Sequence, residues 1–437
     1  MNRIIAAALT SFCLVSSAIA GAQSNSGQVL TLAQCLAIAK TNNLALQQVQ
    51  KARRIAELSR KEISGTAYPQ VKLEAGGTYA PINSGSGYDP VITDQGQLSA
   101  QIVVEQSVYD GGIRGLRKAQ TDLDIRRLAK VQQLAMRDLE FYVTQAFVEL
   151  LRSQSEIALR TEGESTLSDY YLLVKSLNAA GTVGYTDVLS TQSRLLSDSL
   201  AMVQAAQIMA TNKLSLAELI GNAGDTSYAL AGTLDDMSYI SIDTLNVPAS
   251  FDSLQNLALS VARLDHKRTQ FDVRAAQREI IPTLSLTGDL GYLSSHENLL
   301  LSPPERINGI GYEIGIALEM PIFDWGERSL RIQKLQLASD SLQLQTEILR
   351  RSLLTEYRKA LAELLSARKN LHLAEEAINA ASDNSDLAKA KYAGGSALTL
   401  EVLEAYQILT EARLSRIEIL AEMAISGAKI QRINANE

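Results

Sequence analysis

Acidic residues stand just after two short breaks in a sequence that otherwise has a largely helical pattern. The breaks are Ala180–Gly184 and Gly394–Leu398. The polar residues that follow them are Thr186, Asp187, Thr399, Glu401 and Glu404. A carboxylate in the first turn of a helix complements the helix dipole, so ordinary capping explains the pattern. If several copies met at an axis, Glu401 and Glu404 would instead form a ring that attracts cations, and both interpretations stay open.

Residues that usually perform catalysis are not arranged for it in this sequence. The three histidines, His266, His296 and His372, are scattered among predicted helix and loop. The sequence contains no nucleophile motif, CxxC pair or glycine-rich phosphate loop. We therefore expect a protein that is not an enzyme and that binds neither a cofactor nor a metal ion.

Residues 1–22 predict a secretory signal peptide. One arginine precedes an apolar run over 4–19, and small residues follow at Ala20 and Ala22. Removal of this segment leaves Cys35 as the only cysteine, so no intramolecular disulfide is possible, and we expect Cys35 in the core. The remaining net charge is about −8 without a basic cluster, which argues against nucleic-acid binding.

The chain consists of two copies of one unit, which we place at 23–250 and 251–437. Three pairs of segments match at offsets of 213 or 214 residues: Tyr68–Tyr79 with Ile281–Tyr292, Val108–Arg117 with Ile322–Arg331, and Ala180–Leu189 with Gly394–Leu403. Each unit has the order helix, strand, loop, strand, long helix, break, helix. Three matches at nearly one offset indicate a tandem repeat.

Hydrophobic periodicity gives the expected elements of each unit. In the first unit we expect strands near 69–80 and 98–108, and helices near 31–64, 113–178 and 185–220. In the second we expect strands near 282–292 and 311–322, and helices near 252–279, 328–393 and 398–433. Helices of this length reach on the order of 100 Å at 1.5 Å per residue. The expected protein is therefore mostly α-helical, with four strands.

The four strands have the pattern of membrane β-strands. Each alternates apolar and polar residues over about ten positions, the span of a tilted strand through a bilayer. The carboxylates on the polar faces, expected to face a lumen, are Glu74, Glu105, Asp289, Glu313 and Glu319. Aromatic residues mark both strand ends as two expected interface belts: Tyr68, Tyr79, Tyr109, Tyr292, Tyr312, Phe323 and Trp325. An amphipathic sheet on a soluble core is disfavoured, because the adjoining polar helices offer no matching apolar face.

Four strands cannot close a barrel, and an open sheet edge cannot persist in lipid. Several chains must therefore pool their strands. Two chains give eight strands, whose interior fills with side chains, whereas three give twelve strands and room for a lumen. The sequence thus predicts a homotrimer with a twelve-strand β-barrel in a membrane.

Several segments together resemble the TolC-type outer membrane efflux proteins, or outer membrane factors. They are LTLAQCLAIAKTNN, YPQVKL, the turns VYDGGIR and IFDWGER, and the paired segments AGTVGYTDVL and GGSALTLEVL. The resemblance covers residues 31–433. It implies a homotrimer in the outer membrane of a Gram-negative bacterium, with the β-barrel continuous with a periplasmic α-barrel. It also implies docking onto a periplasmic adaptor protein bound to an inner membrane transporter, so that the channel serves tripartite efflux or type I secretion.

The resemblance also implies roles for residues at the two breaks, the expected periplasmic tip. It makes Glu401 and Glu404 the ring that constricts the closed end. It assigns the tip network and adaptor contacts to Gly181, Thr186, Asp187, Tyr392, Gly395 and Thr399. An arginine often found in the second tip loop of the family is Ala397 here, so that interaction is missing.

The competing interpretation is a periplasmic coiled-coil adaptor or structural protein without a membrane barrel. Such a protein would share the export signal, the acidity and the long helices. It would not need four alternating strands of bilayer length, which favours the channel. Within the channel interpretation, drugs, metal ions and secreted proteins remain alternative substrates.

Overall fold

The computed structural model describes residues 29–78, 97–222, 227–237, 251, 253–295 and 308–434. The expected signal peptide, Tyr79 and His296 lie outside these ranges. The chain forms two compact units, each of which takes segments from both halves of the sequence. Unit 1 comprises Met1–Asn43, Leu139–Leu245 and Glu363–Ala428, and unit 2 comprises Leu44–Asp138, Asn246–Ala362 and Lys429–Glu437.

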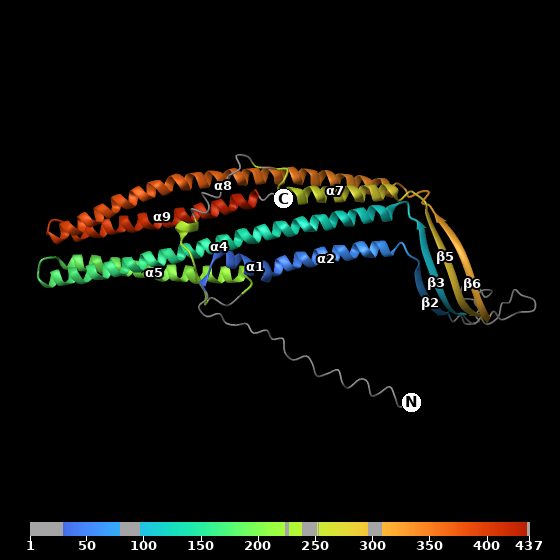
Figure 1. The fold of residues 1–437 in the computed structure, drawn as a ribbon, viewed down its shortest axis with the longest axis horizontal. Helices are drawn as coiled ribbons and strands as arrows, with labels where there is room; N and C mark the ends of the chain where they lie inside the picture. Colours follow the sequence, from blue (N-terminus) through green and yellow to red (C-terminus); the bar gives the residue numbers. More distant parts are fainter. Residues whose placement is uncertain are drawn as a thin grey trace, which may run out of the picture. The chain divides into compact units, whose positions relative to one another are not determined.

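Unit 2 contains an antiparallel sheet of four strands in the order β2-β3-β5-β6. Figure 1 shows these strands side by side in one curved sheet. The strands are β2 (Gln70–Thr78), β3 (Gln97–Tyr109), β5 (Thr283–Ser295) and β6 (Asn308–Glu319). Helices α2 (Leu44–Gly65) and α7 (Leu257–Arg278) precede β2 and β5 in the chain. Because β2 and β6 each have one neighbour among the described strands, the sheet has two open edges in this part of the chain.

Two helices of 67 residues contribute to both units, namely α4 (Ile113–Ala179) and α8 (Glu327–Ala393). Their bounds agree with the expected ranges within one residue. At 1.5 Å per residue each extends on the order of 100 Å. Among the described residues, none of the helices combines the length and the apolar character needed to cross a membrane.

Unit 1 contains α1 (Leu32–Asn42), α5 (Tyr185–Leu219) and all but the last residues of α9 (Thr399–Ile433). A capping box joins Thr31 and Gln34 at the start of α1. Strands β1 (Val29–Leu30) and β4 (Ala229–Leu230) pair in parallel, which the sequence analysis did not predict. Cys35 is fully buried as expected, and burial raises the pKa of its thiol to about 11.

Several expected boundaries differ from the structure. The helix expected over 31–64 is interrupted at Asn43, whose ψ of 118° is extended. The helix expected from 252 begins at Leu257. The last strand runs over 308–319 rather than 311–322, and Pro321 follows its end. Proline has no N–H for a strand ladder, so the segment from Met320 onward was wrongly assigned to the strand.

Asn256 explains the start of α7 and ties it to the end of α9. Its side-chain oxygen accepts a hydrogen bond from the Leu259 N–H at 3.0 Å, which caps the helix. Its side-chain amide donates to the Ile433 carbonyl at 2.7 Å. The residue is 5% exposed, so neither bond is easily replaced by water. One buried side chain therefore pairs a backbone N–H at the start of α7 and a backbone carbonyl at the end of α9.

We predict that Asn256→Ala lowers stability by roughly 2 to 3 kcal/mol, because it removes the cap and leaves a buried carbonyl without its donor. Asn256→Ser keeps a capping oxygen and should lose less. Thermal denaturation of the purified protein measures both, with Asn370→Ala on the exposed face of α8 as a control expected to have little effect. Equal losses for the Ala and Ser variants would contradict the capping role.

Candidate functional site

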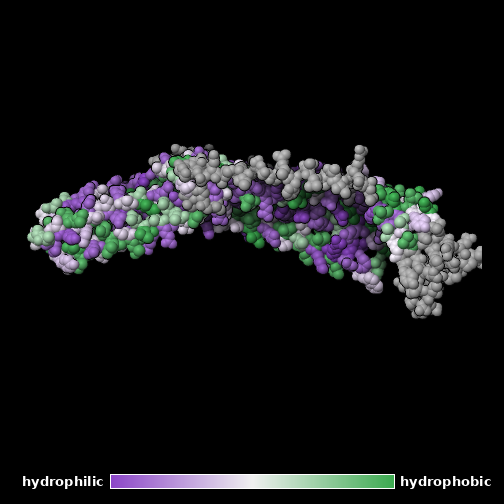
Figure 2. Space-filling view, turned by 90° about the horizontal axis from the view of Figure 1, so that it is seen from below, coloured by the Kyte–Doolittle hydropathy of each residue, from purple (hydrophilic) through white to green (hydrophobic). Residues whose placement is uncertain are grey.

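The sheet of unit 2 has one apolar and one polar face. In the observed register Ile316 lies opposite Leu286, and Ile102 lies between Leu73 and Leu290. These side chains are solvent-exposed within the chain, with Leu73 and Ile316 each 76% exposed. Hydrophobic surface gathers at the strand end of unit 2, whereas the helices beside it are mostly hydrophilic (Figure 2). A contiguous apolar face of this kind marks contact with a partner or a membrane.

The opposite face of the sheet carries the carboxylates singled out in the sequence. The register places Asp289 directly opposite Glu313, so two acidic side chains share one level of the sheet. Lys72 Nζ lies 3.4 Å from the Glu105 carboxylate, and both side chains are about half exposed. In the register of the sheet, all five carboxylates lie on the same face as Lys72: Glu74, Glu105, Asp289, Glu313 and Glu319. The face is therefore acidic and polar.

The two turns from strand to helix use the same hydrogen bonds. At the end of β3, the Asp110 carboxylate accepts from the N–H groups of Gly112 at 3.0 Å and Arg114 at 2.7 Å. Just before α8, the Asp324 carboxylate accepts the matching two bonds, from the N–H groups of Gly326 at 3.1 Å and Arg328 at 3.3 Å. The repeat thus extends to individual hydrogen bonds.

Trp325 departs from this symmetry. Its φ of 51° is left-handed, at the position that Gly111 occupies in the first unit with a φ of 68°. The side chain is 89% exposed, and its ring lies 4.8 Å from that of Phe323 at an angle of 68°. A bulky residue in this conformation costs free energy, which suggests a role at the surface. The described aromatic residues of the expected belts are all at least 38% exposed: Tyr68, Tyr109, Tyr292, Tyr312, Phe323 and Trp325.

The two breaks also repeat each other. Gly181 and Gly395 have φ values of 78° and 69° and end α4 and α8. The next residue in each turn donates its N–H back to the helix: Thr182 to the Leu177 carbonyl at 3.0 Å, and the residue after Gly395 to the Lys391 carbonyl at 2.9 Å. Both helices therefore end in the glycine-dependent left-handed cap.

Residues from four helices meet beside these turns. The rings of Tyr170 and Tyr392 lie 5.3 Å apart at 62°, and the Thr399 hydroxyl lies 3.4 Å from the Tyr392 hydroxyl. Asp187 accepts a hydrogen bond from the Gly184 N–H at 3.1 Å, which caps α5. Burial raises the pKa of the Tyr170 phenol, and nearby Tyr392 and the Asp187 carboxylate raise it further. Tyr392, Thr399 and Asp187 are thus brought together, and Tyr170 joins them without having been predicted.

Glu401 and Glu404 lie apart from this cluster. Both are exposed and sit one helical turn apart on α9. The opposite side of the helix is buried and consists of Val402, Leu403, Ala405 and Tyr406. Leu403 and Tyr406 pack with Leu167 of α4, while Val402 and Ala405 pack with Ala388 of α8. Packing within the chain therefore fixes the rotation of α9 and directs both glutamates outward. Thr186 is likewise exposed.

A polar network that the sequence analysis missed joins α5 to α9. The Tyr406 hydroxyl donates to the Asp198 carboxylate at 3.2 Å, and Arg194 Nε lies 3.4 Å from the same carboxylate. Arg194 also donates to the Gln407 side chain at 2.9 Å. Burial raises the pKa of Tyr406 to about 12. The only sequence signal was the i, i+4 spacing of Arg194 and Asp198.

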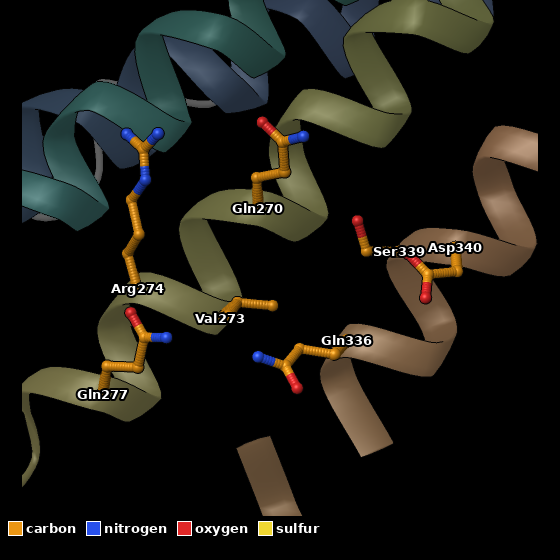
Figure 3. Close-up of a pocket in the computed structure, with 7 residues that line it drawn as sticks. All are labelled: Gln270, Val273, Arg274, Gln277, Gln336, Ser339 and Asp340. Carbon is orange, nitrogen blue, oxygen red and sulfur yellow. The ribbon is translucent and has the colours of Figure 1, made fainter. Parts of the chain in front are cut away.

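A polar hollow of about 360 Å³ lies between α7 and α8 in unit 2. Figure 3 shows Val273 and Gln336 pointing into the space between the two helices. The rest of the lining consists of Gln270, Arg274, Gln277, Ser339 and Asp340. The polar part of this lining consists of three amides, one hydroxyl, one guanidinium and one carboxylate.

The sequence matches the model of a family described as outer membrane efflux protein over residues 34–222 and 253–435. It is 23% identical over 408 residues to outer membrane protein TolC of Vibrio cholerae serotype O1, covering 91% of this chain and 89% of the relative. It is 24% identical over 315 residues to the cobalt-zinc-cadmium resistance protein CzcC of Cupriavidus metallidurans, covering 70% of each.

Solved channel structures share the fold. The CmeC outer membrane channel of Campylobacter jejuni superposes with a TM-score of 0.79 at 17% identity, covering 92% of this chain and 85% of that one. CusC superposes with a TM-score of 0.78 at 16% identity, covering 93% and 92%.

We predict that Tyr406→Phe destabilises unit 1 by about 1 to 2 kcal/mol, because it removes a hydrogen bond to a charged, largely buried carboxylate. Thermal denaturation or limited proteolysis of the purified protein would show the loss. Tyr185→Phe is the matched control, since that side chain is 66% exposed. A loss of equal size in both variants would mean that the network contributes nothing specific.

Proposed function

Because the chain belongs to the outer membrane efflux protein family, we propose that three copies assemble into the exit duct of a tripartite system. The protein is an outer membrane efflux channel with a large periplasmic helical part, and it is not an enzyme. The finer proposal is that a periplasmic adaptor and an inner membrane transporter deliver the substrate to it. In that arrangement the transporter selects among drugs, metal ions or secreted proteins.

The observation that carries the proposal is the amphipathic sheet with two open edges. Its apolar face suits lipid, and its acidic face suits a water-filled lumen. A membrane sheet must close on itself, and three copies of four strands reach a size that leaves a lumen. The proposed barrel therefore has twelve strands, with Glu74, Glu105, Asp289, Glu313 and Glu319 toward the lumen.

The helices of unit 2 support assembly as well. An apolar stripe on α8 recurs mostly every seven residues and is at least 59% exposed: Leu330, Leu337, Leu344 and Ile348. A stripe with this spacing packs against a neighbouring helix as in a coiled coil. Among the described residues the stripe stays largely exposed, so a second copy of the chain is the natural partner.

At the tip, we propose that Glu401 and Glu404 form the gate ring. Their outward orientation on α9 supports this role, whereas Asp187 is engaged as a helix cap. Adaptor contact falls to the exposed residues around the turns, which include Gly181, Thr186 and Gly395. Tyr392 and Thr399 then serve the network behind that surface.

The lipid-facing assignment predicts opposite outcomes for adjacent residues. Ile316→Arg places a charge on the lipid face and should cost roughly 2 to 4 kcal/mol, so less protein should insert as heat-resistant oligomer. Ala317→Arg lies on the polar face and should be tolerated. Outer membrane fractionation with unheated gel electrophoresis compares the two, and equal loss in both would contradict the assignment of faces.

The gate proposal predicts that Glu401→Ala combined with Glu404→Ala raises single-channel conductance in planar bilayers. Because three copies would bring up to six carboxylates together, multivalent cations added on the periplasmic side should block the wild type and not the double variant. Glu376→Ala, on an exposed part of α8, is the control. If conductance and cation block both stayed at wild-type values, capping would account for these residues.

A further inference from the structure

The two β-hairpins of the sheet have the same register. In the first, Gln70 pairs with Glu105, and in the second, Thr283 pairs with Glu319. These residues are mates in the repeat, at the offsets of 213 and 214 found in the sequence. The hairpins are thus structural copies of each other. It follows that the pairing of β3 with β5 is the junction between one copy of the hairpin and the next.

The residue pairing at this junction indicates how the open edges of two copies can pair. In it Glu105 lies opposite Thr287. The repeat mates of these two residues are Glu319 on β6 and Glu74 on β2. We propose that β6 of one chain pairs antiparallel with β2 of a second copy in this register, with Glu319 opposite Glu74 and Ala317 opposite Gly76. The inference rests on the proposed assembly and adds which residues meet across its seams.

The faces of the sheet support this register. It places Leu318 opposite Ala75 and Ile316 opposite Gly77, so the apolar face continues from one copy to the next. Successive side chains of a strand alternate between faces, so a slip of one residue would move Ile316 to the polar face. Only shifts by an even number of residues remain as alternatives.

Charged residues distinguish the seam between copies from the internal junction. The mates of Lys72 and Glu74 within the chain are the neutral residues Ser285 and Thr287. In the proposed register Lys72 lies between Glu105 of its own chain, 3.4 Å away, and Glu319 of the second copy, one step along the same face. Lys72 thereby offsets the repulsion between Glu319 and Glu74. The basic residue of this face is therefore placed where two acidic strands of different copies meet.

Cysteine pairs test the register in the full-length protein with Cys35→Ala as background. Gly76→Cys with Ala317→Cys should form a disulfide, since these positions lie directly opposite. The control pairs are Glu74→Cys with Ala317→Cys and Gly76→Cys with Glu319→Cys, which correspond to shifts of two residues in either direction. Strands β2 and β6 of one chain are separated by two strands, or about 14 Å, so a disulfide can form only between copies.

Oxidised outer membranes are analysed on non-reducing denaturing gels. In this register, most of the protein with the first pair is converted to covalent trimer, and little of the protein with either control pair is converted. Efficient crosslinking of a control pair instead would overturn the register. Trimers by light scattering without any of these crosslinks would overturn the register and leave the proposed function standing. A monomer by light scattering would overturn both.

A charge exchange tests the role of Lys72 separately. Lys72→Glu should lower the temperature at which the trimer dissociates on a gel, and Glu319→Lys in the same chain should restore part of the loss. The combination of Lys72→Glu with Glu313→Lys, six residues from Glu319 along β6, is the matched control. Equal rescue by both lysines would mean that general charge balance, and not the seam, accounts for the effect.

Discussion

The rule that every backbone N–H and C=O group in hydrocarbon must be paired governs this molecule. A sheet of four strands leaves two edges unsatisfied, so one chain cannot complete a membrane structure alone. The tandem repeat supplies the same hairpin twice, and each hairpin has an edge strand that can pair with the next hairpin. In this sense the open edges explain the use of the same hairpin twice.

The repeat preserves hydrogen bonds more strictly than residue types. Asp110 and Asp324 close the same turn with the same pair of N–H donors, and Gly181 and Gly395 end the two long helices alike. Two of the positions that differ between the units are solvent-exposed in the chain. Trp325 replaces a glycine where its side chain is exposed, and Lys72 replaces a serine at an open edge.

Much of this fold could be predicted from the sequence because its signals are long and regular. The ranges of α4 and α8 and the two faces of the sheet follow directly from periodicity, and the family match confirms the resemblance. The break at Asn43 was missed because a single extended residue barely disturbs a helical pattern. The strands β1 and β4 have two residues each, too few for any periodic signal. Prediction of the cluster around Tyr170 requires the rotation of four helices about their axes to be known. That rotation depends on packing between segments far apart in sequence.

The buried thiol of Cys35 has a consequence for the life of the chain in an oxidising compartment. With a pKa of about 11, the folded thiol has only about one thousandth of its population as thiolate at pH 8, and no solvent access. The newly exported, unfolded chain has no such protection, because its thiol regains an ordinary pKa. The packing of α1 is therefore what shields this thiol from oxidation.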